Sequence, residues 1–125
     1  MKKIVLTKKL SPASNALFDG LDVNLVQVKE GDADAFLKEL ADADAVLLST
    51  AFQVDAAVIA AAPSLKVISR TGVGVDNVDV DAATAKGIMV LNTPAANALS
   101  VAEHALSMIG ALSKHKKDAL FSLFV

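Results

Sequence analysis

One glycine-rich segment carries the residues with the most scope for chemistry. It reads Arg-Thr-Gly-Val-Gly-Val-Asp-Asn, from Arg70 to Asn77. It lacks the pattern of a dinucleotide-binding loop, because Asn77 stands at the third glycine position and the helix predicted after it is short. Two closely spaced glycines can instead expose successive backbone N–H groups, which form a small site for an anion such as a carboxylate. An ordinary strand-to-helix turn capped by Asp76 explains the segment equally well.

Other polar side chains give weaker signals. His104 and Glu103 are neighbours on a predicted helix, where adjacent residues point about 100° apart, so they cannot form a His–carboxylate relay. Capping and turn formation account for Asp76, Asp79 and Asp81 with fewer assumptions than a metal site. We therefore predict no catalytic residue and no metal site in this chain.

The elements that must position these residues follow an α/β rhythm. Short β-branched runs alternate with alanine-rich helical stretches, which is typical of a parallel sheet covered on both faces. The predicted strands are residues 3–7, 23–28, 45–48, 65–69 and 88–91. The predicted helices begin at residues 12, 33, 54, 79 and 99, and the first is expected to end near Gly20. We expect a flavodoxin-like doubly wound parallel sheet of about five strands, plus a long apolar C-terminal helix.

In such sheets ligands bind beyond the carboxyl ends of the strands, beside the topological switch point. This rule directs attention to Ser49-Thr50 after the third predicted strand, to residues 72–77 after the fourth and to residues 92–97 after the fifth. Arg70 is the only arginine and ends the fourth strand. For its side chain we favour a salt bridge to a nearby acid over anion binding.

Composition limits the classes of function. In 125 residues, 54% are hydrophobic and 21% charged, which permits a substantial core and excludes a disordered chain. A net charge of −2 gives no electrostatic reason to expect nucleic acid as a partner. There is no cysteine, which excludes disulfides and thiolate chemistry. Neither a leader nor a membrane-spanning apolar run is seen, so we expect a soluble cytoplasmic protein with no membrane partner.

The last predicted helix differs from the others. From Leu99 to Leu112, apolar residues cover most of its circumference. A helix with this pattern is usually buried on more than one side. We therefore divide the chain into a flavodoxin-like domain, residues 1–98, and a terminal helix with a tail, residues 99–125. The arrangement of the apolar tail from Ala119 to Val125 is left open.

Three ordered motifs resemble the D-isomer-specific 2-hydroxyacid dehydrogenase family, of the phosphoglycerate dehydrogenase type. They are Gly-Val-Gly-Val-Asp-Asn-Val-Asp, then Ala-Ala-Thr-Ala-Lys-Gly-Ile-Met-Val-Leu-Asn-Thr-Pro, then Asn-Ala-Leu-Ser-Val-Ala-Glu-His at residues 97–104. The resemblance is dense from about residue 45 to 112 and implies that the backbone amides of Val73, Gly74 and Val75 bind the substrate carboxylate. It also implies that Ser49, Thr50 and Ala51 line the same cleft. Further along the chain, Asn97 would lie at the interdomain hinge, with Ser100 and Val101 facing the nicotinamide.

Two departures from the family shape the expected function. Leu48 stands where members acting on phosphoglycerate often carry Arg, so a simpler 2-hydroxy or 2-keto acid is at least as good a candidate substrate. The family's NAD fingerprint and its catalytic Arg, Glu and His would lie beyond this chain. We therefore expect the substrate-side half of an NAD-dependent dehydrogenase, which alone neither binds NAD nor turns over.

Two alternatives belong to another class. The chain could be a self-associating structural or interaction module, a homodimer formed through the helix from Leu99 to Leu112, because that surface would otherwise stay exposed. It could also be a fragment without a function of its own. A receiver or flavin-binding module is a weaker rival, since Thr7-Lys8-Lys9 stands where an acidic pair or phosphate loop is needed.

Overall fold

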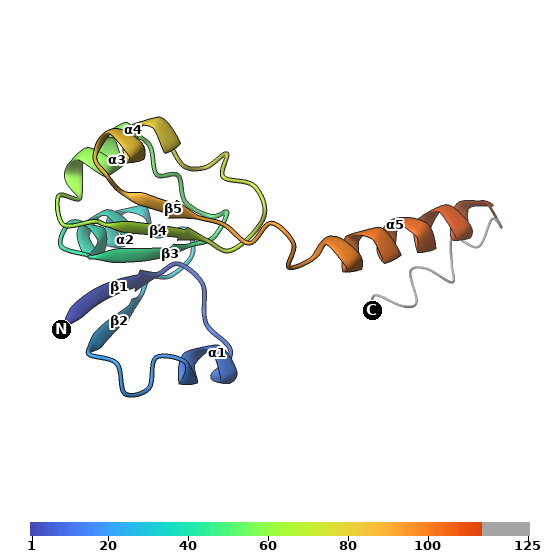
Figure 1. Cartoon of the computed structure of the whole chain (residues 1–125), viewed down its shortest axis with the longest axis horizontal. Helices are drawn as coiled ribbons and strands as arrows, with labels where there is room; N and C mark the ends of the chain where they lie inside the picture. The colour runs from blue at the N-terminus through green and yellow to red at the C-terminus, as the bar shows by residue number, and fades with distance from the viewer. Residues whose placement is uncertain (114–125) are drawn as a thin grey trace. The chain divides into compact units, whose positions relative to one another are not determined.

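The computed structural model describes residues 1–113 and contains one five-stranded sheet (Figure 1). All strand pairs are parallel, and the strand order is β2-β1-β3-β4-β5. The strands are β1 (Lys2–Leu6), β2 (Val23–Gln27), β3 (Ala45–Leu48), β4 (Val67–Arg70) and β5 (Met89–Leu91). The helices are α1 (Pro12–Ala16), α2 (Ala33–Leu40), α3 (Ala56–Ala61), α4 (Val80–Ala85) and α5 (Ala98–Ser113). The expected flavodoxin-like doubly wound sheet and the long C-terminal helix are therefore confirmed.

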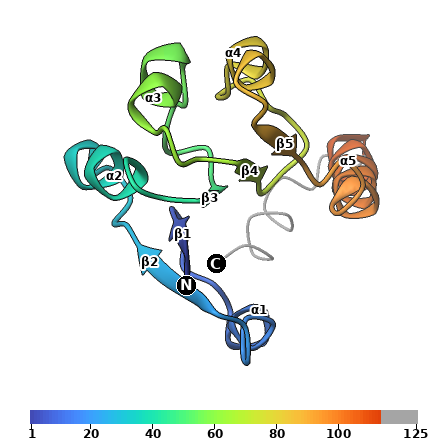
Figure 2. The same ribbon diagram turned by 60° about the vertical axis from the view of Figure 1, so that its left-hand side comes forward.

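Helices cover the two faces of the sheet unequally (Figure 2). Helices α2, α3 and α4 lie along one face, and α1 lies on the other. The face under α2–α4 carries Val5, Val46 and Ile68, which are paired in register and at most 1% exposed. Alternate strand residues point to the opposite face, where Met89 is 59% exposed at the edge strand. The core of this sheet therefore lies mainly on the α2–α4 side.

Capping side chains begin the helices that build this core. Ser11 caps α1, with Pro12 in its first turn, and Asp32, Asp55 and Asp79 cap α2, α3 and α4. Each of these four side chains accepts a hydrogen bond from a backbone N–H in the first turn. The cap of α4 is thus Asp79, and Asp76 does not cap it.

Three predicted boundaries differ from the structure by two residues or more, and the other differences are of one residue. Helix α1 ends at Ala16, and turns carry the chain on to Gly20. Helix α3 begins after Asp55, because Val54 forms an isolated parallel bridge with Val78. Strand β4 begins at Val67, whereas Leu65 is buried in the turn that follows α3.

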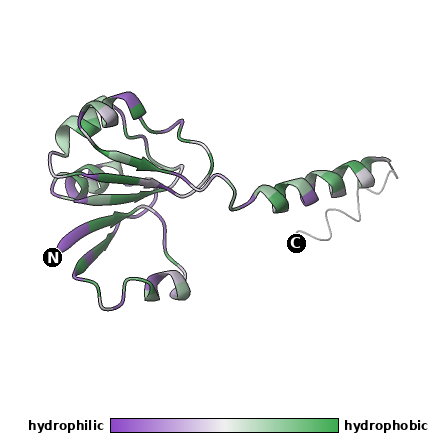
Figure 3. Cartoon of the chain, viewed as in Figure 1, coloured by the Kyte–Doolittle hydropathy of each residue, from purple (hydrophilic) through white to green (hydrophobic). Residues whose placement is uncertain are grey.

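The chain forms two compact units, Met1–Thr93 and Pro94–Val125. The first holds the whole sheet. The second holds α5, in which no residue is buried, and Figure 3 shows this helix mainly in the hydrophobic colour, with a short hydrophilic stretch. The boundary expected after residue 98 stays a prediction, and the tail from Ala119 to Val125 lies outside the described residues. Within residues 1–113, none of the helices has the length and apolarity needed to cross a membrane.

Candidate functional site

The carboxyl ends of the strands bring three loops to one edge of the sheet (Figure 1). The loop after β3 runs through residues 49–55, and the loop after β4 runs through residues 71–79. They are tied at their start, where the Thr71 N–H donates to the Leu48 carbonyl at 2.9 Å. The chain after β5 joins them, because the Thr93 N–H donates to the Gly72 carbonyl at 2.9 Å. The edge singled out from the sequence is therefore a connected set of loops.

In the loop from Gly72 to Val75, three of the four carbonyls accept a hydrogen bond and the Gly72 N–H donates to the Arg70 carbonyl, whereas the next three N–H groups are available. The carbonyl of Val73 accepts from Asn92 Nδ2 at 2.8 Å, and that of Val75 accepts from the Val78 N–H at 2.9 Å. Among the described residues, no acceptor is bonded to the N–H groups of Val73, Gly74 or Val75. Consecutive backbone N–H groups in a turn can form an anion-binding nest, and these three donors have no acceptor within residues 1–113 that would compete with an anion.

An acidic group lies beside these amides. A Cβ placed on Gly74 would come within 2.7 Å of the Asp76 carboxylate oxygen Oδ1. This negative charge opposes anion binding, whereas the Arg70 guanidinium under Gly72 favours it. A Cβ on Gly72 would overlap with Nη1 of that guanidinium. The charge around the loop is thus mixed, with the cation buried and the carboxylate exposed.

Ser49 is anchored by Thr7, a residue that the sequence did not single out. Thr7 follows β1 and is 2% exposed, and the Leu47 carbonyl and Ser49 Oγ, each 3.1 Å from its Oγ1, are alternative acceptors for its single hydroxyl proton. The Ser49 N–H donates back to Thr7 Oγ1 at 2.7 Å. Ser49 Oγ also accepts from the Ala51 N–H at 3.3 Å. Thr7 could have been found from the sequence, because it is a polar residue at the end of the first strand, beside the topological switch point. Beside this anchored serine, Thr50 and Ala51 are exposed.

Arg70 and Asn77 form a buried polar pair between the loops. Arg70 is 7% exposed and Asn77 4% exposed. Arg70 Nε donates to Asn77 Oδ1 at 3.2 Å, and Arg70 Nη1 donates to the Thr71 carbonyl at 2.5 Å. The salt bridge expected for Arg70 is wrong, because no carboxylate within residues 1–113 pairs with it. Neutral oxygens replace the acid, since the strand end buries the side chain beside the amide and the turn carbonyl.

The remaining candidates belong to the second unit and are described separately. Asn97 precedes α5, and its carbonyl accepts from the Val101 N–H at 3.0 Å. Asn97, Ser100 and Val101 are exposed. Their expected roles at the hinge and beside the nicotinamide stay predictions.

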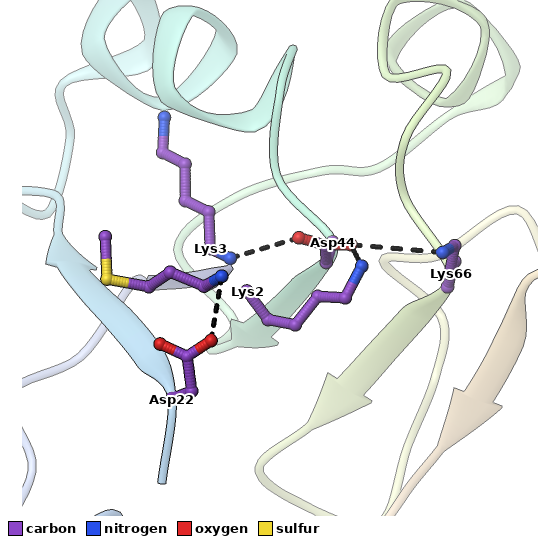
Figure 4. A network of polar contacts seen from close by, with 6 residues as sticks. Lys2, Lys3, Asp22, Asp44 and Lys66 are labelled. Carbon is purple, nitrogen blue, oxygen red and sulfur yellow. Dashed lines mark hydrogen bonds and ion pairs between the residues drawn. The ribbon is translucent and has the colours of Figure 1, made fainter.

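Perturbed carboxyl groups lie at the opposite, amino edge of the sheet (Figure 4). Hydrogen bonds from the Lys2 ammonium at 2.7 Å and the Lys3 backbone N–H at 3.1 Å hold the pKa of Asp44 below its usual value. A hydrogen bond from the Lys3 ammonium likewise lowers the pKa of Asp42. The bond to Asp44 raises the pKa of Lys2. This network joins strands and has no connection to the loops at the carboxyl edge.

The described residues of the first unit lack the glycine pattern and the presented helix N-terminus of a dinucleotide-binding site. The third glycine position is Asn77, whose side chain is committed to neighbouring carbonyls. Helix α4 begins three residues later at Val80 and is already capped by Asp79, so its N-terminus is not presented by the loop. Within residues 1–113, no group of three or more acidic or histidine side chains could hold a metal ion. The site is suited to a small anion.

Known proteins resemble this chain in both sequence and structure. The sequence profile described as D-isomer specific 2-hydroxyacid dehydrogenase, catalytic domain, matches residues 4–122. A D-3-phosphoglycerate dehydrogenase from Mycobacterium tuberculosis is 47% identical over 120 residues, which cover 96% of this chain and 22% of that protein. The chain thus spans about a fifth of the length of the curated relatives it matches.

Solved structures agree with the sequence comparison. An NAD⁺-bound 3-phosphoglycerate dehydrogenase from Entamoeba histolytica has a TM-score of 0.73 at 28% identity, covering 86% of this chain and 38% of that one. A glyoxylate reductase from Paecilomyes thermophila has a TM-score of 0.74 at 32% identity, covering 89% and 38% respectively. These proteins share the fold of the first unit and continue well beyond the matched region.

Proposed function

Because the chain belongs to the D-isomer-specific 2-hydroxyacid dehydrogenase family, we propose that it forms the substrate side of such an enzyme. In this proposal the amides of Val73, Gly74 and Val75 bind the carboxylate of a small 2-hydroxy or 2-keto acid. Ser49, Thr50 and Ala51 line the other side of the bound acid. The observation that carries the proposal is the set of three consecutive N–H groups without an acceptor in the described part of the chain.

The substrate is proposed to need no phosphate. Leu48 precedes Ser49 and is fully buried in the core, so this position offers no cation to a second anionic group. The buried Arg70 supplies positive charge close to the loop, and no carboxylate within residues 1–113 is paired with it. One cation at the start of this loop, offset in part by the exposed Asp76 carboxylate, suits a single carboxylate better than two anionic groups. We therefore propose a short 2-hydroxy or 2-keto acid, with lactate, glycolate and pyruvate as the candidates to test.

Redox chemistry is proposed to come from NAD held by residues outside this chain. NAD carries the hydride when it is bound, and the part contributed here is to hold and orient the acid. Asn97 is proposed to act at the hinge, with Ser100 and Val101 on the nicotinamide side. Because the described residues provide no dinucleotide cradle, the isolated chain is proposed neither to bind NAD alone nor to turn over. We place this function in the cytoplasm.

A titration followed by NMR tests the proposal. The ¹⁵N-labelled chain is titrated with D-lactate, and with NADH in a separate sample. D-lactate should shift the amide signals of Val73, Gly74 and Val75 in a saturable way, while propanol, which lacks the carboxylate, should not. NADH should cause no saturable shift. Shifts by lactate that miss this loop, or tight NADH binding, would contradict the proposal.

A second proposed role is self-association through α5. Its apolar side chains are widely exposed, including Leu99 at 73%, Leu106 at 69% and Ile109 at 63%. A surface of this kind on a 16-residue helix is typical of helices that pack against a partner. We propose that two copies of the chain pair through the surface from Leu99 to Leu112. This role is compatible with carboxylate binding by the first unit.

A further inference from the structure

We propose that Asn77, oriented by Arg70, is a positioning residue that sets the loop after β3 against the carboxylate-binding loop after β4. The inference rests on the proposed function and extends it to two side chains that do not touch the ligand. It follows from the hydrogen bonds that join the two loops.

The Asn77 side chain spans the gap between the loops. Its Nδ2 donates to the Ser49 carbonyl at 2.9 Å and to the Phe52 carbonyl at 2.8 Å. The backbone carbonyl of Asn77 accepts from the Val54 N–H at 2.9 Å. One residue therefore holds the loop after β3 at three points, and two of them flank Thr50 and Ala51.

Arg70 decides which way the Asn77 amide faces. A guanidinium can only donate, so the atom 3.2 Å from Arg70 Nε must be the amide oxygen. The amide nitrogen is then forced toward the two carbonyls, and both of its protons are used. Without Arg70, the amide loses the partner that fixes this orientation. Arg70 itself is held by the Thr71 carbonyl at the start of the loop it serves.

The buried amide is better suited to positioning than to packing. Both Asn77 and Arg70 are more than nine-tenths buried, where an unsatisfied polar group is costly. An apolar pair of similar size would fill this space without specifying where the Ser49 and Phe52 carbonyls lie. The hydrogen bonds fix that relation, and with it the distance from Ser49–Ala51 to the free amides of Val73 and Gly74. A ligand that contacts both loops depends on that distance.

Two substitutions separate these contacts. Asn77→Asp keeps the size of the side chain and can still accept from Arg70, but it turns a carboxylate oxygen toward the Ser49 and Phe52 carbonyls. Arg70→Lys keeps the positive charge and removes the Nε donor that orients the amide. Asn24→Asp is the matched control, because Asn24 is exposed on β2 and its side chain makes no hydrogen bond within residues 1–113.

D-lactate binding is measured by ¹⁵N NMR at a temperature where the spectra show every variant folded. Asn77→Asp should raise the Kd about tenfold, Arg70→Lys should raise it less, and Asn24→Asp should leave it unchanged. In the free wild-type chain, the side-chain amide protons of Asn77 should exchange slowly, and Arg70→Lys should make them exchange faster. A residue that served only stability would lower the unfolding temperature without changing the Kd of the folded protein.

The possible outcomes distinguish the positioning role of Asn77 from the proposed carboxylate binding on which it rests. Wild-type binding at the loop, with a Kd within about twofold in both variants, would overturn the positioning role alone. Failure of the wild-type chain to bind lactate would overturn the proposed function and the inference together. If Asn77→Asp does not fold, Arg70→Lys decides, since its charge and bulk resemble those of the wild-type side chain.

Discussion

A methyl group would meet different neighbours at Gly72 and at Gly74. At Gly72, φ is +155°, and a Cβ would overlap with the guanidinium of Arg70, which is 7% exposed. At Gly74, φ is not in the left-handed region, and a Cβ would meet only the tip of the exposed Asp76 side chain. A buried guanidinium with fixed partners cannot move aside easily, whereas an exposed carboxylate can. The two glycines of the motif therefore serve different purposes.

We predict that Gly72→Ala lowers the free energy of unfolding by about 1–3 kcal/mol, through backbone strain and displacement of Arg70. Gly74→Ala should change it by less than about 1 kcal/mol, because Asp76 can rotate away. Urea denaturation of the two variants beside the wild-type chain measures both values. Equal losses would show that the Arg70 contact does not set the requirement for glycine at position 72.

The amino edge of the sheet depends on one carboxylate that serves two strands. Asp44 precedes β3, and its side chain accepts from the Lys2 ammonium and the Lys3 N–H of β1. Lys66, which directly precedes β4, places its ammonium 4.0 Å from the same carboxylate (Figure 4). The backbone adds to this junction, since the Asp44 N–H donates to the Lys3 carbonyl at 2.9 Å. This edge thus fixes β1 beside β3 by charge as well as by the ladder.

The lowered pKa of Asp44 gives a pH prediction. A carboxyl whose folded pKa lies below its unfolded value stabilises the fold fully above pH 3.8, and this contribution is lost as the pH falls through the folded pKa. Asp44→Asn should therefore be less stable than wild type near neutral pH, and the difference should shrink below pH 3.8. Urea midpoints across this range measure the difference. As control, Asp22→Asn removes a more exposed ion pair with the N-terminus and should have little effect.

Helix α4 follows the candidate loop directly, so its cap fixes where that loop ends. Asp79 accepts from the Ala82 N–H at 2.9 Å, whereas Asp81 is exposed in the same first turn. Asp79→Ala should lower the free energy of unfolding by about 0.5–2 kcal/mol through loss of the cap. Asp81→Ala removes only its interaction with the helix dipole and should cost about 0.3–1 kcal/mol. Thermal unfolding of both variants tests the order, and a larger loss for Asp81→Ala would contradict it.

Periodicity predicted the elements of the first unit well, because its strands and helices are local patterns. The β-branched runs indicate the strands, and the capping aspartates indicate where helices begin. Contacts between loops carry no such signal. Arg70 and Asn77 are seven residues apart, but the segment that follows Arg70 is a loop without helix or strand periodicity. Their contact therefore depends on the path of the backbone. Thr7 and Ser49 are likewise joined only by the pairing of β1 with β3.

At the scale of the whole molecule, the sheet unit buries an apolar core, whereas helix α5 does not. The sheet unit buries a cluster that includes the stacked rings of Phe36 and Phe52, whose centroids are 4.5 Å apart. Helix α5 buries none of its side chains. Solved relatives extend well beyond the region matched here, since this chain covers 38% of the Entamoeba histolytica protein. Exposed apolar surface of this kind is typical of an interface, and for a sample of the chain alone we propose a second copy as the partner.

We predict that the chain self-associates through α5. Ile109, at 63% exposure, stands on the apolar surface, and Ser107 is a polar residue on the same helix. Ile109→Glu places a charge where two helices would pack and should shift sedimentation from dimer to monomer at the same concentration. Ser107→Glu adds the same charge at a position that is already polar, and it should weaken association less. A wild-type chain that sediments as a monomer at high concentration would exclude the dimer. Equal weakening by both substitutions would instead assign the effect to net charge, and the packing surface would then lie elsewhere than around Ile109.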